Sequence, residues 1–497
     1  MSQNEIAIVG GGLGGISAAV YLKLAGFDVC LFEKNERVGG RANRLERDGF
    51  IFDTGPSLLN YPWVFQDFFA AAGKRLEDYV ELLPVDPALI FRWPDRKELI
   101  LSSDVTRLRE SLYRLEPECD AGLMAFLRDA HIKYKLAFEK LVSKNVTSPL
   151  DWLVALTPRE MSYVTVWRSL YSELGRFFRS RYIKEALGAY AMYLGGSPFE
   201  LPGFFSILSY GELAYGLWLP KRGIYGLVEG MERLANELGV VIRTQTPVVA
   251  IETSQGRVRG LRLADGSREQ FPIVLSNVDV PYTDTFLLNG DKNFPKLQKR
   301  AKRMKMTPGV CTFYWGLKTP LHNLAHHTIF LPDNYKKTFD ELMHEGKIPS
   351  DIPFYVSVPS ATDRSLAPLG GACVFVLIPT PRLSQLGDVD WSVIRQDLRQ
   401  RVLKRLEEEH YAIDPDSIVV EEFFSVEEWH RRYGLYDGSA FGAAHTLFQV
   451  GPFRAGNQSA QIKGLYYTGA STTPGTGLPM VVLSGKLTAE RVVANVR

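Results

Sequence analysis

The opening of the chain constrains its fold most, because an apolar strand, a glycine-rich loop, a helix and a second strand follow one another there. The elements that we expect, in order, are a strand at 6–9, a helix at 16–25 and a strand at 28–33. Gly26 follows the helix, where a residue with a positive φ commonly ends one. This order predicts a βαβ unit at the start of the chain.

The loop of this unit has the spacing of a dinucleotide-binding motif. Gly10, Gly12 and Gly15 fit G-x-G-x-x-G, in which the glycines allow a tight turn, a close pyrophosphate and close helix–strand packing. The following helix directs free N–H groups at the phosphates. Glu33 ends the second strand, where an acid binds a ribose hydroxyl and favours FAD or NAD over NADP. A ligand-free glycine turn and a solvated strand end are the alternatives.

Two further segments favour FAD over NAD. Small residues precede Arg41, so its guanidinium can approach a phosphate, although a plain surface charge is the alternative. Residues 469–479 form a second glycine-rich loop before a helix expected at 480–493. A helix N-terminus there would stabilise negative charge near N1 and the C2 carbonyl of a reduced flavin. A glycine-rich connection without a ligand is the alternative.

The remaining pattern predicts an α/β fold with a Rossmann-like FAD-binding domain that is assembled from discontinuous segments. Additional expected elements are helices at 227–238 and 391–408, strands at 240–243, 273–276 and 465–468, and a hairpin of 248–252 and 257–263. Segments 1–75, 222–290 and 455–497 would form the FAD-binding domain. Segments 76–221 and 291–454 would form an inserted α+β domain. A chain of 497 residues exceeds the usual size of one core.

Composition excludes several functions. A net charge of +2 gives no reason to expect a nucleic-acid partner. The four cysteines form no CxxC pair, which argues against a zinc site or disulfide framework and fits a reducing compartment. We expect no signal peptide and no transmembrane helix, and peripheral membrane contact stays open. His326 and His327 should face opposite ways on a strand, so we expect no metal site and name no catalytic acid or base.

The sequence resembles the bacterial phytoene/diapophytoene desaturase family, within the amine-oxidase-like flavoproteins. The segments that carry the resemblance are 8–15, 33–35, 38–41, 48–56 and 469–479. It implies FAD as cofactor, with Glu33 on the adenosine ribose and Val248 beside the adenine. The second glycine-rich loop, 469–479, which we call the closing loop, would lie over the isoalloxazine. The cofactor-binding residues that we expect are Gly10, Gly12, Leu13, Gly14, Gly15, Glu33, Lys34, Gly40, Arg41, Gly55, Pro56, Ser57, Val248, Gly469, Ala470, Gly477, Pro479, Met480 and Val481.

The resemblance also implies the reaction, which is desaturation of an acyclic carotenoid precursor, 4,4'-diapophytoene or phytoene, with hydride transfer to flavin N5. It implies that the inserted domain binds the polyene substrate and a membrane. We expect a peripheral place on the cytoplasmic side of the cell membrane and oxygen or a quinone as electron acceptor, and the oligomeric state stays open. Alternatives are an oxygenase that oxidises terminal methyl groups of a C30 carotenoid, a polyene isomerase, and a prenyl-lipid-binding flavoprotein. Segments 357–360 and 365–368 resemble the C30 desaturases, whereas 324–327 and 485–487 resemble the oxidases. Thr473 stands where the family often has histidine.

The hydrocarbon needs an apolar site, and the best candidate in the sequence is the aromatic-rich segment 202–219. It contains one acid, Glu212. The segment could line a tunnel or dip into a bilayer interface, where Trp and Tyr are favoured. An ordinary buried helix is the alternative.

Overall fold

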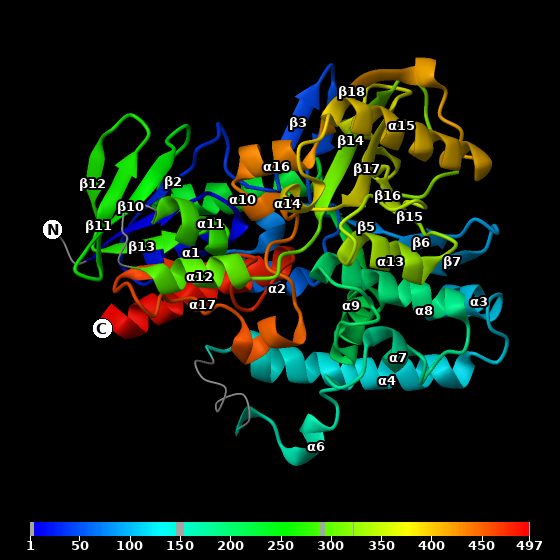
Figure 1. The fold of residues 1–497 in the computed structure, drawn as a ribbon, viewed down its shortest axis with the longest axis horizontal. Coiled ribbons are helices and arrows are strands. Elements are labelled where there is room, and N and C mark those ends of the chain that lie inside the picture. Colours follow the sequence, from blue (N-terminus) through cyan, green and yellow to red (C-terminus); the bar gives the residue numbers. More distant parts are fainter. Residues whose placement is uncertain (1–3, 146–153, 289–293, 322, 497) are drawn as a thin grey trace.

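A computed structural model describes residues 4–145, 154–288, 294–321 and 323–496. One end of the molecule is built on a five-stranded parallel sheet (Figure 1). Its strands, in spatial order, are β19 (Leu465–Tyr467), β13 (Ile273–Ser276), β1 (Glu5–Val9), β2 (Asp28–Phe32) and β9 (Val241–Arg243). Three distant parts of the chain therefore share one sheet. The expected boundary at 290/291 lies outside the described residues, and the division into domains stays a prediction.

Helices α1 (Leu13–Leu24), α10 (Ile224–Glu237), α17 (Leu478–Val496) and α2 (Pro62–Ala71) pack beside this sheet. Gly485 lets α1 and α17 meet closely, since a Cβ on it would lie 2.6 Å from the carbonyl oxygen of Gly14. The first and last long helices of the chain are thus in direct contact, as Figure 1 shows. This contact brings both glycine-rich loops to the same end of the sheet.

The predicted helices at 16–25, 227–238 and 480–493 form, but each begins two or three residues earlier. Their first turns contain glycine or proline, which the hydrophobic pattern does not register, although both are tolerated where N–H groups lack partners. The helix predicted at 391–408 is α15 (Trp391–Glu408). The predicted hairpin is β10 (Val248–Ser254) with β11 (Arg257–Leu263), and a third strand, β12 (Arg268–Gln270), was not predicted.

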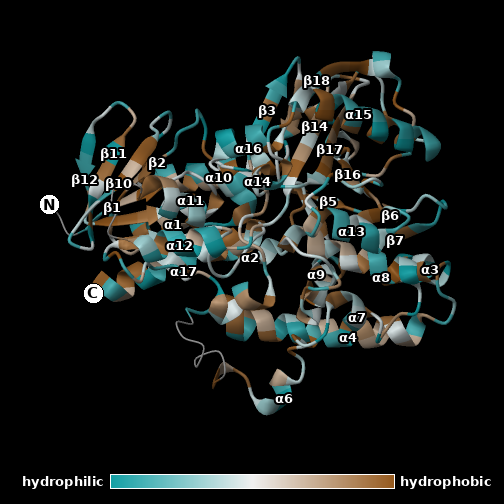
Figure 2. Cartoon of the chain, viewed as in Figure 1, coloured by the Kyte–Doolittle hydropathy of each residue, from teal (hydrophilic) through white to brown (hydrophobic). Residues whose placement is uncertain are grey.

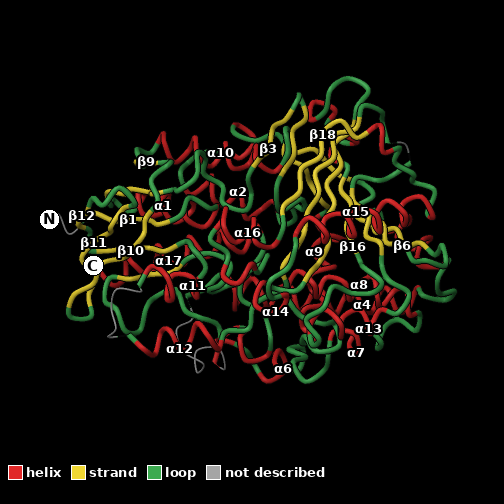
Figure 3. The backbone as a smooth tube through the Cα atoms, turned by 45° about the horizontal axis from the view of Figure 1, so that its top comes forward, coloured by secondary structure: helices red, strands yellow, loops and turns green. Residues whose placement is uncertain are grey.

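The other end of the molecule is a seven-stranded mixed sheet with a helical layer beneath it (Figures 1 and 3). Its strands, in spatial order, are β18 (Ile418–Phe424), β14 (Gly309–Leu317), β17 (Ala372–Thr380), β16 (Phe354–Ser357), β15 (His327–Phe330), β6 (Leu89–Arg92) and β7 (Glu98–Leu101). Every residue of β14 is buried, so this strand runs through the core. Figure 2 shows the contrast between such hydrophobic strands and the many hydrophilic residues of α15.

The remaining elements surround these sheets. The helical layer contains α3 (Val105–Tyr113), α4 (Asp120–Leu136), a π-helical turn (Ala137–Val142), α6 (Pro158–Met161), α7 (Leu170–Leu174), α8 (Arg181–Gly188) and α9 (Ile207–Tyr215). Two-stranded ribbons pair β3 (Arg44–Arg47) with β4 (Phe50–Asp53), and β5 (Leu82–Val85) with β8 (Leu217–Pro220). Further helices are α11 (Val280–Tyr282), α12 (Pro295–Arg303), α13 (Tyr335–Met343), α14 (Leu383–Leu386) and α16 (Val426–Tyr433).

Candidate functional site

A cavity of about 800 Å³ extends from the carboxyl ends of β1, β2 and β13 toward the seven-stranded sheet. Ligands of open α/β sheets bind at this end of the strands. Of the cofactor-binding residues expected from the sequence, all but Gly15 line the cavity. Gly15 instead packs against the preceding turn, where a Cβ would lie 2.3 Å from the carbonyl oxygen of Gly10. The assignment of these residues to the cofactor stays a prediction.

Backbone contacts fix the conformation of the first glycine-rich loop. Gly10 has φ +97° and donates its N–H to the carbonyl oxygen of Phe32 at 2.8 Å. Helix α1 starts directly after Gly12, and no side chain caps this end. Its N-terminus therefore presents backbone N–H groups at the cavity, the arrangement that binds phosphate.

Asn277 is a site residue that the sequence analysis did not select. It follows β13, and its side chain lies against both glycine loops: a Cβ on Gly12 would be 2.7 Å from Asn277 Oδ1, and one on Gly469 would be 2.9 Å from its Nδ2. Its Nδ2 also donates to the carbonyl oxygen of Thr468 at 3.2 Å. The available signal was its position directly after a strand that neighbours β1.

Glu33 is 4% exposed, and two backbone amides and the side-chain amide of Asn35 hold its carboxylate. Oε2 accepts a hydrogen bond from the N–H of Gly11 at 2.8 Å, and Oε1 accepts two from Asn35, each of 2.9 Å. The carboxylate is thus oriented at the end of β2 and lines the cavity. The alternative of a solvated strand end is excluded by this burial.

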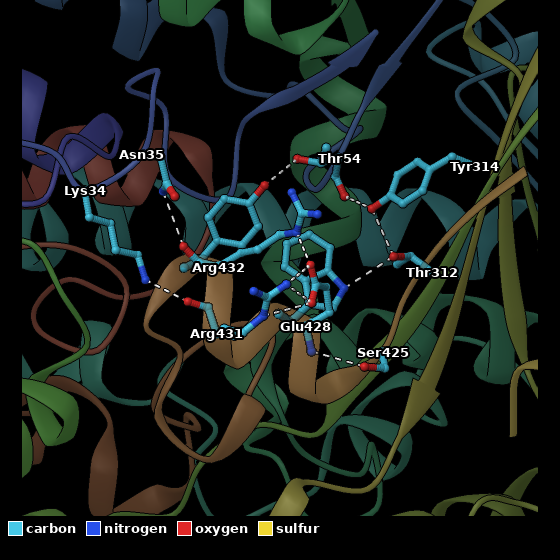
Figure 4. A network of polar contacts seen from close by, with 11 residues as sticks. Lys34, Asn35, Thr54, Thr312, Tyr314, Ser425, Glu428, Arg431 and Arg432 are labelled. Atoms are coloured by element: carbon cyan, nitrogen blue, oxygen red, sulfur yellow. Dashed lines mark hydrogen bonds and ion pairs between the residues drawn. The ribbon is translucent and has the colours of Figure 1, made fainter. Parts of the chain in front are cut away.

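The loop after β2 is anchored to α16 (Figure 4). Lys34 Nζ donates to the carbonyl oxygen of Arg431 at 2.8 Å, and Asn35 Nδ2 donates to that of Arg432 at 3.3 Å. From the other side of the same network, Tyr314 of β14 donates to the carbonyl oxygen of Thr54 at 2.6 Å. Helix α16 and β14 therefore connect the glycine-loop end of the cavity to the large sheet.

Arg41 is positioned at the cavity wall by two oxygens. Its Nη1 donates to the carbonyl oxygen of Ala440 at 2.8 Å, and its Nη2 lies 3.8 Å from Asp279 Oδ1. Asp279, from the segment after β13, also accepts a hydrogen bond from Ser471 of the closing loop at 2.8 Å. The guanidinium is partly accessible and faces the cavity, so it can bind a phosphate there.

The closing loop is held by a buried arginine. Arg454 Nε donates to the carbonyl oxygen of Thr472 at 2.8 Å, and Nη2 donates to that of Ala470 at 2.5 Å. Thr473, at the position where the family often has histidine, donates its hydroxyl to Asn457 Oδ1 at 2.9 Å. A histidine is nevertheless close by, because His445 Nε2 would lie 2.3 Å from a Cβ on Gly475.

The far half of the cavity is apolar. Its lining includes Leu141, Val164, Phe204, Phe205, Ile207 and Leu208. Only part of the segment 202–219 contributes, because Gly203–Ser206 form a 3-10 turn, Ile207–Tyr215 form α9, and Leu217–Pro220 pair with β5 as a strand. The change from helix to strand within this segment could not be predicted from its aromatic-rich composition.

The expectation that His326 and His327 face opposite ways is wrong, since their ring centroids lie 4.0 Å apart. His326 precedes β15 and is not bound by the alternation of the strand. Each ring instead forms a hydrogen bond of 2.6 Å through Nδ1, His326 with Thr362 and His327 with Tyr355. Burial lowers the pKa of both histidines, so they are neutral structural groups.

Within the described ranges, no group of three or more His, Cys, Asp or Glu side chains could hold a metal ion. In the same ranges, no helix is long and apolar enough to cross a membrane.

The residues at the polar end fit FAD. A buried acid at the end of β2, an uncapped helix N-terminus after a glycine turn and a second glycine-rich loop are the parts that bind a ribose, a pyrophosphate and a flavin ring. When bound, the flavin accepts two electrons from an organic substrate as a hydride.

Comparison with known proteins agrees with this arrangement. The family model described as flavin-containing amine oxidoreductase matches residues 13–493. The chain is 38% identical to a zeta-carotene-forming phytoene desaturase of Myxococcus xanthus, over 98% of this chain and 94% of the relative. It is 32% identical to a lycopene-forming phytoene desaturase of Pantoea ananas, over 97% of both chains. It is 33% identical to a 4,4'-diapolycopene oxygenase of a Methylomonas species, over the whole of both.

Among known structures, putrescine oxidase superposes with a TM-score of 0.64 at 14% identity, over 99% of both chains. An oxidoreductase from Methanosarcina mazei superposes with a TM-score of 0.61 at 16% identity, over 98% of this chain and 100% of the other. At such low identity these structures establish the shared fold alone.

Proposed function

Because the chain belongs to the carotenoid desaturase family of flavin-containing amine oxidoreductases, we propose that it desaturates an acyclic carotenoid precursor, phytoene or 4,4'-diapophytoene. FAD is its cofactor. The observation that carries the proposal is the cavity itself, which runs from the two glycine-rich loops into an apolar, aromatic chamber without interruption. A long hydrocarbon can lie in that chamber with one end at the flavin-binding loops.

The chain contributes binding and water exclusion to this reaction. Apolar side chains of α9, the π-helical turn and the 3-10 turn before α9 replace water around the hydrocarbon. Removing hydride from an allylic carbon leaves positive charge spread along the polyene. Tyr61, Phe204 and Phe205 line this wall, and the face of an aromatic ring attracts such charge. The wall therefore favours a cationic transition state and keeps water away from it.

Product analysis tests this proposal. Purified protein with FAD is incubated with phytoene and, separately, with 4,4'-diapophytoene in lipid vesicles, under air and anaerobically with a quinone. Chromatography and mass spectrometry should reveal products lighter by pairs of hydrogens and absorbing at longer wavelength. If neither precursor is converted with either oxidant, the proposal is wrong. The oxidant that supports turnover identifies the electron acceptor, which we propose to be oxygen or a quinone.

A carotenoid oxygenase is the second candidate, because a 4,4'-diapolycopene oxygenase is 33% identical over the full length. In this reaction a terminal methyl group of a C30 carotenoid gains oxygen. Incubation with 4,4'-diapolycopene under labelled oxygen distinguishes the two candidates. Incorporation of the label, together with inactivity on both colourless precursors, would replace the first proposal by the second.

We also propose that the protein binds peripherally to the cytoplasmic face of the cell membrane, the source of its substrate. Met161, Val166, Leu447 and Phe453 line the cavity and are also exposed, so the chamber opens beside apolar surface. Phe448, in the loop from Leu447 to Phe453, is 78% exposed. Such side chains, with nearby cations, are typical of interfacial binding.

Cations lie next to this loop. Gln449 forms two hydrogen bonds with the backbone of Lys305, at 2.7 and 2.8 Å, and Lys305 follows the basic helix α12. Co-sedimentation with vesicles of anionic lipid should decrease strongly for Phe448→Ser with Phe453→Ser, while Leu369→Ser, a distant exposed apolar site, should leave it unchanged. Equal binding of all three proteins would contradict a membrane contact at this loop.

A further inference from the structure

A buried acid lies in the apolar half of the cavity. Glu212, in the middle of α9, is 2% exposed and lines the chamber. Tyr190 donates its hydroxyl hydrogen to Glu212 Oε2. Within the described residues no ion pair involves Glu212, whereas the buried Glu173 is paired with Lys133 at 2.7 Å. A carboxyl group without a cation in an apolar chamber is costly, so packing alone does not explain it.

The Glu212 carboxyl group lies near Tyr61 and Tyr355, which adjoin Ser57, one of the residues expected to bind the cofactor. Helix α9 packs closely against Tyr61, since a Cβ on Gly211 would be 2.0 Å from the Tyr61 hydroxyl oxygen. Tyr61 follows the segment of Ser57, and Tyr355 donates its hydroxyl to Ser57 Oγ at 2.8 Å. The titratable groups that face the carboxyl group are Tyr61, Tyr190, Tyr193 and Tyr355. All four are neutral phenols, because burial raises their pKa values.

We propose that the Glu212 carboxylate is the catalytic base that accepts the proton released as the new double bond forms. This inference rests on the proposed desaturation. One C–H bond of the substrate loses its hydrogen with both electrons to the flavin, the two-electron oxidant. On the adjacent carbon a second C–H bond breaks, its electron pair becomes the π bond, and the proton moves to the carboxylate. The charge is balanced, and Tyr190 holds the carboxyl group in place.

The protonation behaviour of Glu212 suits this task. Burial raises the pKa of Glu212 to about 8, against the opposing effect of the Tyr190 hydrogen bond. A base whose pKa lies near neutrality exchanges protons most effectively at physiological pH. Because the carboxylate is the active form, the turnover rate should rise with pH through this pKa and then level off.

His445 is the rival base in the cavity, because it is buried and its Nδ1 has no hydrogen-bond partner among the described residues. Burial lowers the pKa of His445 well below its usual value, and the nearby Arg454 lowers it further. A proton on this imidazole would meet both an apolar environment and a like charge. Glu212 becomes neutral on accepting the proton, and so the apolar chamber favours the transfer.

Glu212→Gln tests the proposal with a matched control. Glu185→Gln removes another buried acid, which accepts a hydrogen bond from Trp93 at 2.7 Å and lies outside the cavity lining. We expect Glu212→Gln to lower kcat about 10²- to 10⁴-fold with little change in KM. Its residual activity should lose the rise with pH, whereas Glu185→Gln should retain the kcat and pH profile of the wild type.

Infrared spectroscopy measures the protonation of Glu212 directly and does not depend on turnover. Infrared difference spectra of the FAD-free protein should show a protonated carboxyl band that disappears with a midpoint near pH 8 in the wild type. The component that titrates near pH 8 should be absent from Glu212→Gln and present in Glu185→Gln, while a component of Asp53, whose pKa burial raises to about 7, should remain in both. Thermal midpoints and FAD content exclude a folding defect, and Glu212→Asp should restore part of kcat with an altered pH profile.

The outcomes separate this inference from the proposed function. If the wild type converts neither precursor, the proposed function fails. If the wild type is active and Glu212→Gln has the same kcat and pH profile, the base assignment alone is wrong. Loss of activity in His445→Gln with an unchanged Glu212→Gln would assign the proton to the imidazole instead.

Discussion

Replacing Glu33 by Gln should weaken FAD binding, with a magnitude that follows from its hydrogen bonds. Both carboxylate oxygens are occupied, Oε2 by the N–H of Gly11 and Oε1 by the two N–H groups of Asn35. An amide has one acceptor oxygen, so one of these buried donors would face an NH₂ group. An unsatisfied buried donor costs about 1–3 kcal/mol. A hydrogen bond from the ribose to a charged acceptor contributes a further 1.5–3 kcal/mol, roughly.

The expected result is a dissociation constant for FAD raised roughly 10- to 150-fold, the range that the ribose hydrogen bond alone predicts. Deflavinated protein is titrated with FAD while flavin fluorescence is followed, and the thermal midpoint is measured without FAD. Glu36→Gln removes the same charge from an exposed position of the same loop and should leave both quantities unchanged. An unaltered FAD affinity of Glu33→Gln would refute the assignment of this acid to the ribose.

Further predictions concern packing, the closing loop and the thiols. Gly15→Ala should lower the thermal midpoint and FAD retention, because a Cβ would lie 2.3 Å from the Gly10 carbonyl oxygen. Gly456→Ala is the control, since a Cβ there meets nothing within 4 Å, and equal midpoints of the two variants would contradict the prediction. Arg454→Lys should lower the free energy of unfolding by roughly 1–3 kcal/mol and release FAD, because one ammonium group cannot reach all the carbonyl oxygens that the guanidinium binds. Full FAD content in the purified variant would contradict this prediction. Alkylation of the native protein should label Cys30 alone, because the other three cysteines are buried. Labelling should be slow, because burial raises the pKa of Cys30 to about 11. Fast labelling of two or more thiols would be evidence against this prediction.

The sequence predicted the elements whose signal is local. The strands at 6–9 and 28–33 and the helix at 391–408 were predicted from hydrophobic pattern and flanking residues alone. Helix starts were predicted two or three residues late, since glycine or proline at the first turn carries no hydrophobic signal. The segment 202–219 was not resolved into its turn, helix and strand, because β8 exists only through its pairing with β5.

The site shows the same division. Gly10, Gly12 and Glu33 were selected by spacing, because a phosphate-binding turn needs particular residue types at particular intervals. Asn277 and His445 were not selected, since each reaches the cavity through a contact with a segment distant in sequence.

The sequence by itself therefore determined the dinucleotide-binding end of the protein, where function depends on backbone conformation and hence on local residue choice. Tertiary structure alone decided the apolar chamber, the pairing of His326 with His327 and the isolation of Glu212 among phenols. The reason is physical. Burial and its effect on a pKa depend on everything that surrounds a group, and most of those neighbours come from other parts of the chain.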